Sequence, residues 1–155
     1  MCAEFQISFV SALPSAFRAE LEDLLFFNPE QGRFQKTILD SLQKYGSPAL
    51  VETERGIEVN VEGIGKVQAL FALVSDPAES VTELAGAILF YRVQPEKIRI
   101  LHWVVAPEFL WNGEYGDAML ACRLIDAVRD VACRISGVRK VSLHYQRGRL
   151  ISWNV

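Results

Sequence analysis

The alternation of apolar and polar residues predicts that the chain begins with a strand and two helices. Residues 5–10, FQISFV, alternate in polarity and carry β-branched and aromatic side chains, as strands do. From about Pro14 the apolar positions repeat at helical spacing, which predicts a helix with one apolar stripe. The same spacing over residues 34–45 predicts a second helix, which ends at the glycine and proline of YGSP.

The middle of the chain is rich in strand patterns. Residues 49–76 contain two or three predicted strands, separated by turns at ERG and GIG. Residues 83–93 and 98–107 then predict a hairpin of long apolar strands around the turn QPEK. The run ILHWVV is nearly continuous in apolar character, which indicates a central strand covered on both faces.

A long helix is predicted from residue 117 to about residue 135. Four charged residues form one narrow stripe and almost every other position is apolar, so we expect most of the circumference to pack against a sheet. RKVSLHY then predicts a strand parallel to residues 98–107, because a helix connects the two. The final LISWNV predicts a short closing strand. The charged stripe consists of Arg123, Asp126, Asp130 and Arg134.

Length and composition fit one domain over residues 1–155, of α/β class with a mixed (α+β) sheet. The chain has 155 residues, of which 50% are hydrophobic and 23% charged, as in ordinary globular domains. The predicted order is β-α-α-β-β-β-α-β, followed by the closing strand. The net charge of −3 argues against a nucleic-acid-binding face and against binding to an anionic membrane surface.

The three cysteines, Cys2, Cys122 and Cys133, show no metal-ligand spacing such as CxxC. We interpret the last two as buried small hydrophobic residues of the long helix, in a reducing compartment. The N-terminal segment has no basic leader, and no apolar run approaches the roughly 20 residues that span a bilayer. A cytoplasmic protein without a metal site is therefore expected.

A loop with two glycines, Gly113 and Gly116, precedes the long helix in the stretch FLWNGEYGDAML. Two interpretations are open. Glycines permit a close approach of backbone to a ligand, and amides at a helix N-terminus bind anions, so the loop could cradle a phosphate. The glycines could instead only turn the chain. Asp117 would then suit the N-cap of the helix, where its side chain would compete with a phosphate.

Four segments in order, AGAILFYRV, ILHWVVAPEF, WNGEYGDAML and GVRKVSLHY, resemble the GNAT superfamily of acyl-CoA-dependent N-acetyltransferases. That family often shows a strand like GxIxFxR, a strand ending in V-x-P, a loop Q/R-x-x-G-x-G/A, a helix and a strand. The resemblance covers residues 83–145, whereas the first eighty residues agree only in element order. The loop lacks the family's basic residue, and only ten residues follow Tyr145, where the family continues with a helix and two strands.

The resemblance implies a central strand that ends in a bulge and splays from its parallel neighbour. Pantetheine of acetyl-CoA, or of another acyl-CoA, would lie in that gap, and the pyrophosphate would rest on amides of the loop and helix. The acceptor would be an amine of a small molecule or peptide. The implied cofactor-binding residues are Val104, Val105, Trp111, Asn112, Gly113, Tyr115, Gly116 and Ala118.

Acylation of an amine requires a base for the ammonium and an acid for the thiolate. His102, on the predicted central strand, is the candidate base, and alternation places it on one face with Val104. Tyr145, at the end of the next strand, is the candidate acid. The alternatives are a histidine satisfied by hydrogen bonds inside the sheet and a tyrosine at its boundary. Further candidates, with solvated surface positions as their alternative, are His144, Glu108, Glu114, Arg147 and Arg149.

These expectations together predict an N-acyltransferase that acts by direct transfer. One alternative is a non-catalytic module on the same scaffold that binds an acyl-CoA or an unrelated ligand. Another is an interaction module in which LISWNV adds a strand to a partner and so forms a homodimer. The transferase prediction depends on open main-chain donors around Gly113 and Gly116, facing a gap between diverging parallel strands.

Overall fold

The computed structural model of the protein describes residues 5–26, 48–145 and 149–155. The second predicted helix, over residues 34–45, and the candidate Arg147 therefore lie outside the described residues. The first predicted strand and helix are confirmed. β1 (Gln6–Val10) is followed by a short 3₁₀ turn and by α1 (Arg18–Phe26), which buries Leu21, Leu24 and Leu25.

Five strands lie between the two helices of the described part. They are β2 (Pro48–Thr53), β3 (Gly56–Val61), β4 (Gly65–Asp76), β5 (Val81–Gln94) and β6 (Lys97–Val105). The strands predicted over residues 49–76, with turns at ERG and GIG, and the predicted hairpin after them are confirmed, whereas the predicted order of elements counted only three strands in this region. Consecutive members of this series pair antiparallel, as the short turns between them require. The predicted hairpin of apolar strands is the pair β5–β6.

The C-terminal part contains the predicted strand–helix–strand unit. Two 3₁₀ turns, Pro107–Phe109 and Gly116–Ala118, lead from β6 to α3 (Leu120–Arg134). The strand β7 (Lys140–Tyr145) then pairs parallel with β6, and β8 (Arg149–Asn154) pairs antiparallel with β7. The prediction of a parallel return strand and of a short closing strand is thus confirmed.

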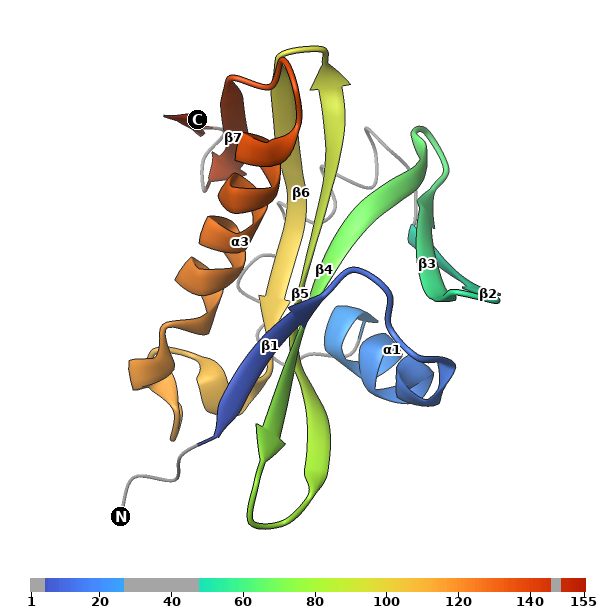
Figure 1. Cartoon of the computed structure of the whole chain (residues 1–155), viewed down its shortest axis with the longest axis vertical. Coiled ribbons are helices and arrows are strands. Elements are labelled where there is room, and N and C mark those ends of the chain that lie inside the picture. Colours follow the sequence, from blue (N-terminus) through green and yellow to red (C-terminus); the bar gives the residue numbers. More distant parts are fainter. Residues whose placement is uncertain (1–4, 27–47, 146–148) are drawn as a thin grey trace.

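The strands form one mixed, mostly antiparallel sheet in the order β2-β3-β4-β5-β6-β7-β8 (Figure 1). β1 lies outside this path and pairs with the second half of β4, whereas β3 pairs with its first residues. The two helices cover opposite faces. Alternate residues of β5 separate accordingly, since Ala85 and Ile88 pack in the cluster with α3 and Leu84 and Ala87 in the cluster with α1.

α3 buries a single stripe of residues at every fourth position, so it does not pack most of its circumference as predicted. Its buried residues are Leu120, Leu124, Val128 and Ala132. Cys122 and Cys133 are exposed free thiols, which corrects the expectation that both are buried. Among the described residues, no helix combines the length and the apolar character needed to cross a membrane.

Candidate functional site

The parallel strands β6 and β7 pair only over the first part of their length. Four residue pairs join them, from Lys97 with Lys140 to Ile100 with Leu143. At that point the register of β6 with β5 shifts, because Leu89 faces His102 while its neighbour Phe90 faces Ile100. Leu101 is therefore the extra residue of a β-bulge, which bends a strand and increases its twist. Beyond the bulge β6 continues to Val105 without β7 beside it in the ladder.

Main-chain groups of β6 face the side that β7 has left. The amide of Ala106 donates to the carbonyl of Ala85 on β5 at 2.7 Å, so Ala106 directs its main chain toward β5. Because main-chain groups alternate in direction along a strand, Trp103 and Val105 direct theirs toward the β7 side. The side chains of Val104 and Val105 are both buried, each against a different face of the sheet.

His102 lies on the face of the sheet opposite α3. Its register partner is Leu89, and the register of Val104 with Ala87 confirms that His102 and Val104 share a face. Burial lowers the pKa of His102 to about 4, so the imidazole is neutral at neutral pH. The imidazole has no hydrogen-bond partner among the described residues, and its lowered pKa makes it a weaker base than an ordinary histidine.

The glycine loop uses its amides internally. The amide of Gly113 donates to the carbonyl of Leu110 at 2.7 Å, and the amide of Gly116 donates to the carbonyl of Gly113 at 3.2 Å. The amides of Tyr115 and Ala118 are bonded in the same way, to Glu108 and Tyr115. The expectation of open donors around Gly113 and Gly116 is therefore wrong, and the condition on which the transferase prediction depended is not met at this loop.

The two glycines are needed because the loop packs tightly on itself. A Cβ on Gly113 would lie 2.5 Å from the carbonyl oxygens of Pro107 and Glu108. A Cβ on Gly116 would lie 2.6 Å from the carbonyl oxygen of Trp111. Both distances are far below a van der Waals contact, so only glycine fits. The glycines serve the turn from strand to helix, which was the second interpretation of this sequence.

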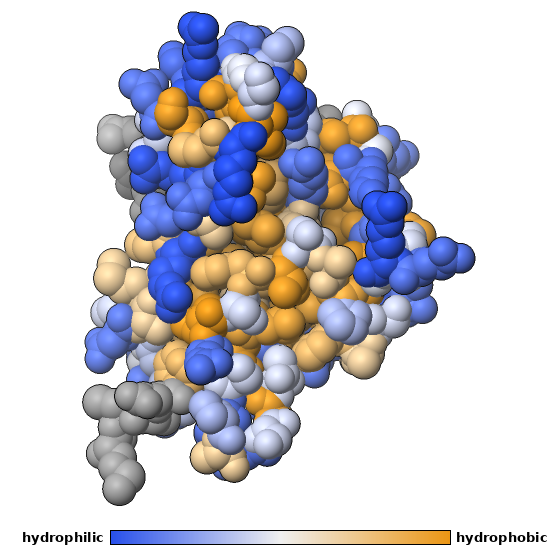
Figure 2. Space-filling view, viewed as in Figure 1, coloured by the Kyte–Doolittle hydropathy of each residue, from blue (hydrophilic) through white to orange (hydrophobic). Residues whose placement is uncertain are grey.

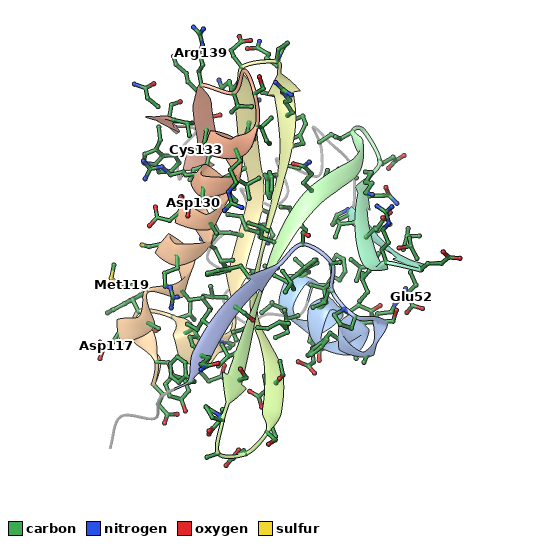
Figure 3. The ribbon with its side chains drawn as sticks, viewed as in Figure 1. Glu52, Asp117, Met119, Asp130, Cys133 and Arg139 are labelled. Atoms are coloured by element: carbon green, nitrogen blue, oxygen red, sulfur yellow. The ribbon has the colours of Figure 1, made fainter. Side chains whose placement is uncertain are left out.

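Open amides lie instead in the first turn of α3. The helix begins at Leu120, after Met119 in a left-handed conformation (φ 51°), and Asp117 makes no capping hydrogen bond, contrary to the prediction. Figure 3 shows Asp117 and Met119 at this end of the helix. The first bonded amide is that of Arg123, to Met119 at 3.1 Å. The amides of Leu120, Ala121 and Cys122 have no acceptor within the described part of the chain, and with the helix dipole they favour an anion.

The other loop residues take different positions. Trp111 is 81% exposed and Asn112 is exposed, so neither packs against the core. Tyr115 packs against the rings of Phe5 and Phe109, with centroids 5.0 and 5.3 Å away, and it faces a cavity away from β7. The side chains of Tyr145 and His144 lie outside the description, so their proposed roles as acid stay predictions.

A cavity of about 710 Å³, which we call the acidic cleft, lies where β6 ends. It is bounded by α1, the start of β5 and the segment Ala106–Phe109, with apolar walls such as Leu24, Leu84 and Phe109. No lysine or arginine is among the described residues that line it. Five carboxylates do line it: Glu20, Asp23, Glu83, Glu108 and Glu114.

The carboxylates of the acidic cleft have no cationic partner among the residues that the structure describes. None of the five forms an ion pair with a described residue, and the contact that Glu20 makes is with the amide of Leu84 at 3.1 Å. Their charge acts on Tyr115, whose pKa is raised first by the charge of Glu114, then by burial and by a side-chain hydrogen bond to Glu114. The charges of Glu83 and of Asp76, which lies outside the cleft, have smaller effects. The cleft therefore attracts cations.

Sequence reasoning singled out only Glu108 and Glu114 of this group. Glu20, Asp23 and Glu83 come from α1 and β5, far from the loop in the chain, and no spacing rule connects them. The signal that could have found them is the pairing of the start of β5 with the end of β6, which places Glu83 near the loop.

Together these features define an α+β protein with a mostly antiparallel mixed sheet, in which the parallel strands β6 and β7 of the described part pair only over their first four residue pairs. Comparison of the chain with protein-family models, with curated proteins and with solved structures found no match. What the protein does therefore has to follow from its own geometry.

Proposed function

We propose that the protein is an N-acyltransferase, which transfers an acetyl or other acyl group from acyl-CoA to an amine by direct transfer. The observation that carries the proposal is the opening between β6 and β7 beyond the bulge at Leu101. A bulged central strand that leaves its parallel neighbour is what the resemblance to the GNAT superfamily implies. We propose further that the sheet of this protein has the strand topology of that superfamily.

The cofactor would lie along the opened edge of β6. The main-chain groups of Trp103 are directed toward this edge, where they can bond to the amides of pantetheine. The open amides of Leu120, Ala121 and Cys122 can hold the pyrophosphate, in place of the loop amides expected from the sequence. Trp111 and Asn112 are exposed and precede α3 by a few residues in the sequence, and they stay candidates for contacts with the nucleotide.

The acceptor amine would enter from the acidic cleft. Ala106 and Pro107, which line that cleft, directly follow the part of β6 that faces the gap, so one strand end borders both. Carboxylates raise the local concentration of a protonated amine. The amine nitrogen then bonds to the thioester carbonyl carbon, the carbon–sulfur bond breaks, and the thiolate takes up a proton.

His102 and Tyr145 stay the candidate base and acid of this reaction. A neutral imidazole can take the proton that the ammonium must lose before attack, directly or through water. His102 does not itself line the acidic cleft, which favours transfer through water. Tyr145 ends β7, the strand on the other side of the gap.

One observation favours a scaffold that binds a ligand without catalysis. The loop has no basic residue for a phosphate, and its glycine amides are already bonded.

Another observation favours a homodimer. β8 follows β7 at once and lies at the end of the sheet, so its outer edge can pair with β8 of a second copy.

Thermal unfolding with CoA and acetyl-CoA tests the proposal. We expect the Tm to rise with ligand concentration, because a ligand that binds the native state stabilises it by mass action. Ala121→Pro removes one amide donor at a position in the first helical turn, where proline is tolerated, and it should weaken this rise. Cys122→Ala keeps all amides and is the matched control. An unchanged Tm at millimolar CoA would contradict the proposal.

Release of free thiol in the presence of acetyl-CoA and a panel of amines separates an enzyme from a binder. An enzyme releases thiol faster when a suitable amine is present, whereas the non-catalytic alternative gives a rise in Tm without thiol release. The homodimer alternative predicts neither effect, and it predicts loss of the dimer on removal of residues 150–155.

A further inference from the structure

A second cavity, of about 680 Å³, lies between α3 and β3 and shares no residue with the acidic cleft. We call it the apolar groove. β4 and β5 form its floor, and the bend after β1 closes one end. Figure 2 shows apolar residues gathered in the middle of this face of the molecule, with hydrophilic residues around them. Its volume is within the range of pockets that hold small ligands.

The groove exists because α3 covers only part of the sheet. The helix buries one stripe of residues, so the neighbouring positions Ala127 and Val131 remain half-buried and form one wall. Below them Leu70 and Phe90, which are buried core residues of β4 and β5, line the floor of the groove. An apolar surface of this kind in a concave site favours an apolar ligand group, because its burial removes both surfaces from water.

The rim of the groove is positively charged on balance. Three cations line it against two carboxylates, Glu58 and Asp130. Lys66 and Glu58 neutralise each other in an ion pair of 2.8 Å. Two guanidinium groups, Arg55 and Arg134, then stand against the single carboxylate of Asp130, and neither forms an ion pair with a residue of the described ranges.

We propose that the apolar groove binds an amphipathic anion, with an apolar chain or ring on the floor and an acidic group held by a guanidinium group of the rim, that of Arg55 or that of Arg134. Arginine suits this role, because its planar fork of donors matches a carboxylate. The exposed carboxamide of Gln68 also lines the groove and has no partner among the described residues, so it is an additional donor. This proposal does not depend on the proposed transferase activity.

Three ligands with the same alkyl chain test the choice of charge: octanoate, octan-1-ol and octyltrimethylammonium. Titration of each into the isotopically labelled protein is followed by NMR on the amides and methyl groups of the groove. We expect octanoate to shift groove signals such as those of Ala127 and Val131, with an affinity roughly threefold to tenfold above that of the alcohol. The cation should bind least.

Variants separate the floor from the rim. Ala127→Trp fills the groove and should abolish binding of octanoate and of the alcohol alike, whereas Cys133→Trp adds the same side chain to an exposed position of the same helix and should leave binding unchanged. The double variant Arg55→Gln, Arg134→Gln should bind octanoate no better than the alcohol. Gln68→Glu, at an exposed position, adds a negative charge to the floor and should weaken octanoate binding without unfolding the protein.

The proposal is overturned if the alcohol or the cation binds as tightly as octanoate, since the guanidinium groups would then select nothing. It is also overturned if Ala127→Trp, shown to be folded by its NMR spectrum, binds octanoate normally. Shifts confined to the acidic cleft would equally count against it.

Discussion

The two cavities of this protein have nearly the same volume and opposite charge. The acidic cleft, of about 710 Å³, carries five carboxylates and no described cation. The apolar groove, of about 680 Å³, carries three cations against two carboxylates. The net charge of the whole chain is −3, and this value predicts the local charge of neither cavity. The fold therefore brings together charged residues that are distant in the sequence, and the charge of the residues that line each cavity determines which ligands it attracts.

The cavities also differ in how they are built. The acidic cleft is formed at one end of the sheet by a helix, a strand end and the glycine loop, so its shape depends on irregular backbone. The apolar groove is formed by the regular elements α3, β3, β4 and β5. We therefore expect changes in the loop to alter the cleft and to leave the groove intact.

The largest effect is expected from Gly113→Ala and Gly116→Ala. A Cβ at either position would lie 2.5–2.6 Å from backbone oxygens, which cannot move aside as a flexible side chain can. Each change should lower the free energy of unfolding by about 1–3 kcal/mol, measured by urea titration, and displace NMR signals of Glu114 and Tyr115. Signals of the apolar groove should not move. Asn112→Ala, in the same loop but with an exposed side chain, is the control. Equal stability of all three variants would show that the loop is loosely packed.

The next effect concerns His102 and depends on pH. The native pKa of about 4 is below the ordinary value of 6.5, so the unfolded state binds a proton first as pH falls. Stability should therefore fall between pH 6.5 and pH 4, by about 1–2 kcal/mol from pH 7 to pH 5. His102→Gln should remove this part of the pH dependence, measured as the difference between the two unfolding curves. If both proteins lose stability equally over this range, His102 is not held neutral by burial.

The sequence predicted the regular elements well, because their signals are local. The alternation at residues 5–10 and the apolar runs of the hairpin gave β1, β5 and β6, and the helix between two strands gave the parallel pair of β6 and β7. The predicted turns at ERG and GIG both close hairpins, so residues 49–76 form three strands, and the predicted order of three strands for the whole middle region was too low. The fraction of the circumference of α3 that packs against the sheet was overestimated, because an apolar residue on a helix can remain exposed without packing against another element.

The candidate site was harder to predict. A glycine in a loop signals freedom of the backbone, but it does not tell which amide is already bonded, so Gly113 and Gly116 were taken as donors to a ligand. The acceptor for each amide is another residue of the same loop, at a position that no spacing rule specifies. Likewise, Glu20 and Glu83 become neighbours of Glu114 only through the fold, and only their cavity reveals them.

A smaller effect is expected when the charge of the acidic cleft is reduced. Glu83→Gln and Glu114→Gln should each weaken binding of spermidine roughly twofold to fivefold, because exposed charges contribute modestly to binding. The measurement is an NMR titration in which spermidine shifts signals of the cleft and octanoate shifts signals of the groove. Added salt should weaken spermidine binding further, as expected for screened charges. If spermidine shifts groove signals instead, the assignment of opposite fields to the two cavities is wrong.

The smallest effect is expected for the pKa of Tyr115, which lines the acidic cleft and responds to the charge of its carboxylates. Its pKa is raised first by the charge of Glu114, so Glu114→Gln should bring the pKa back toward the ordinary value. The ultraviolet absorbance of the phenolate, followed as pH is raised and compared between variant and parent, gives this shift. Glu108→Gln removes a carboxylate of the same cleft that does not act on Tyr115, and it is the matched control. If both variants lower the pKa of Tyr115 equally, the electrostatic effect comes from the cleft carboxylates together and not mainly from Glu114. If neither variant lowers it, Glu114 points away from Tyr115, and the cleft is less acidic there than its lining residues indicate.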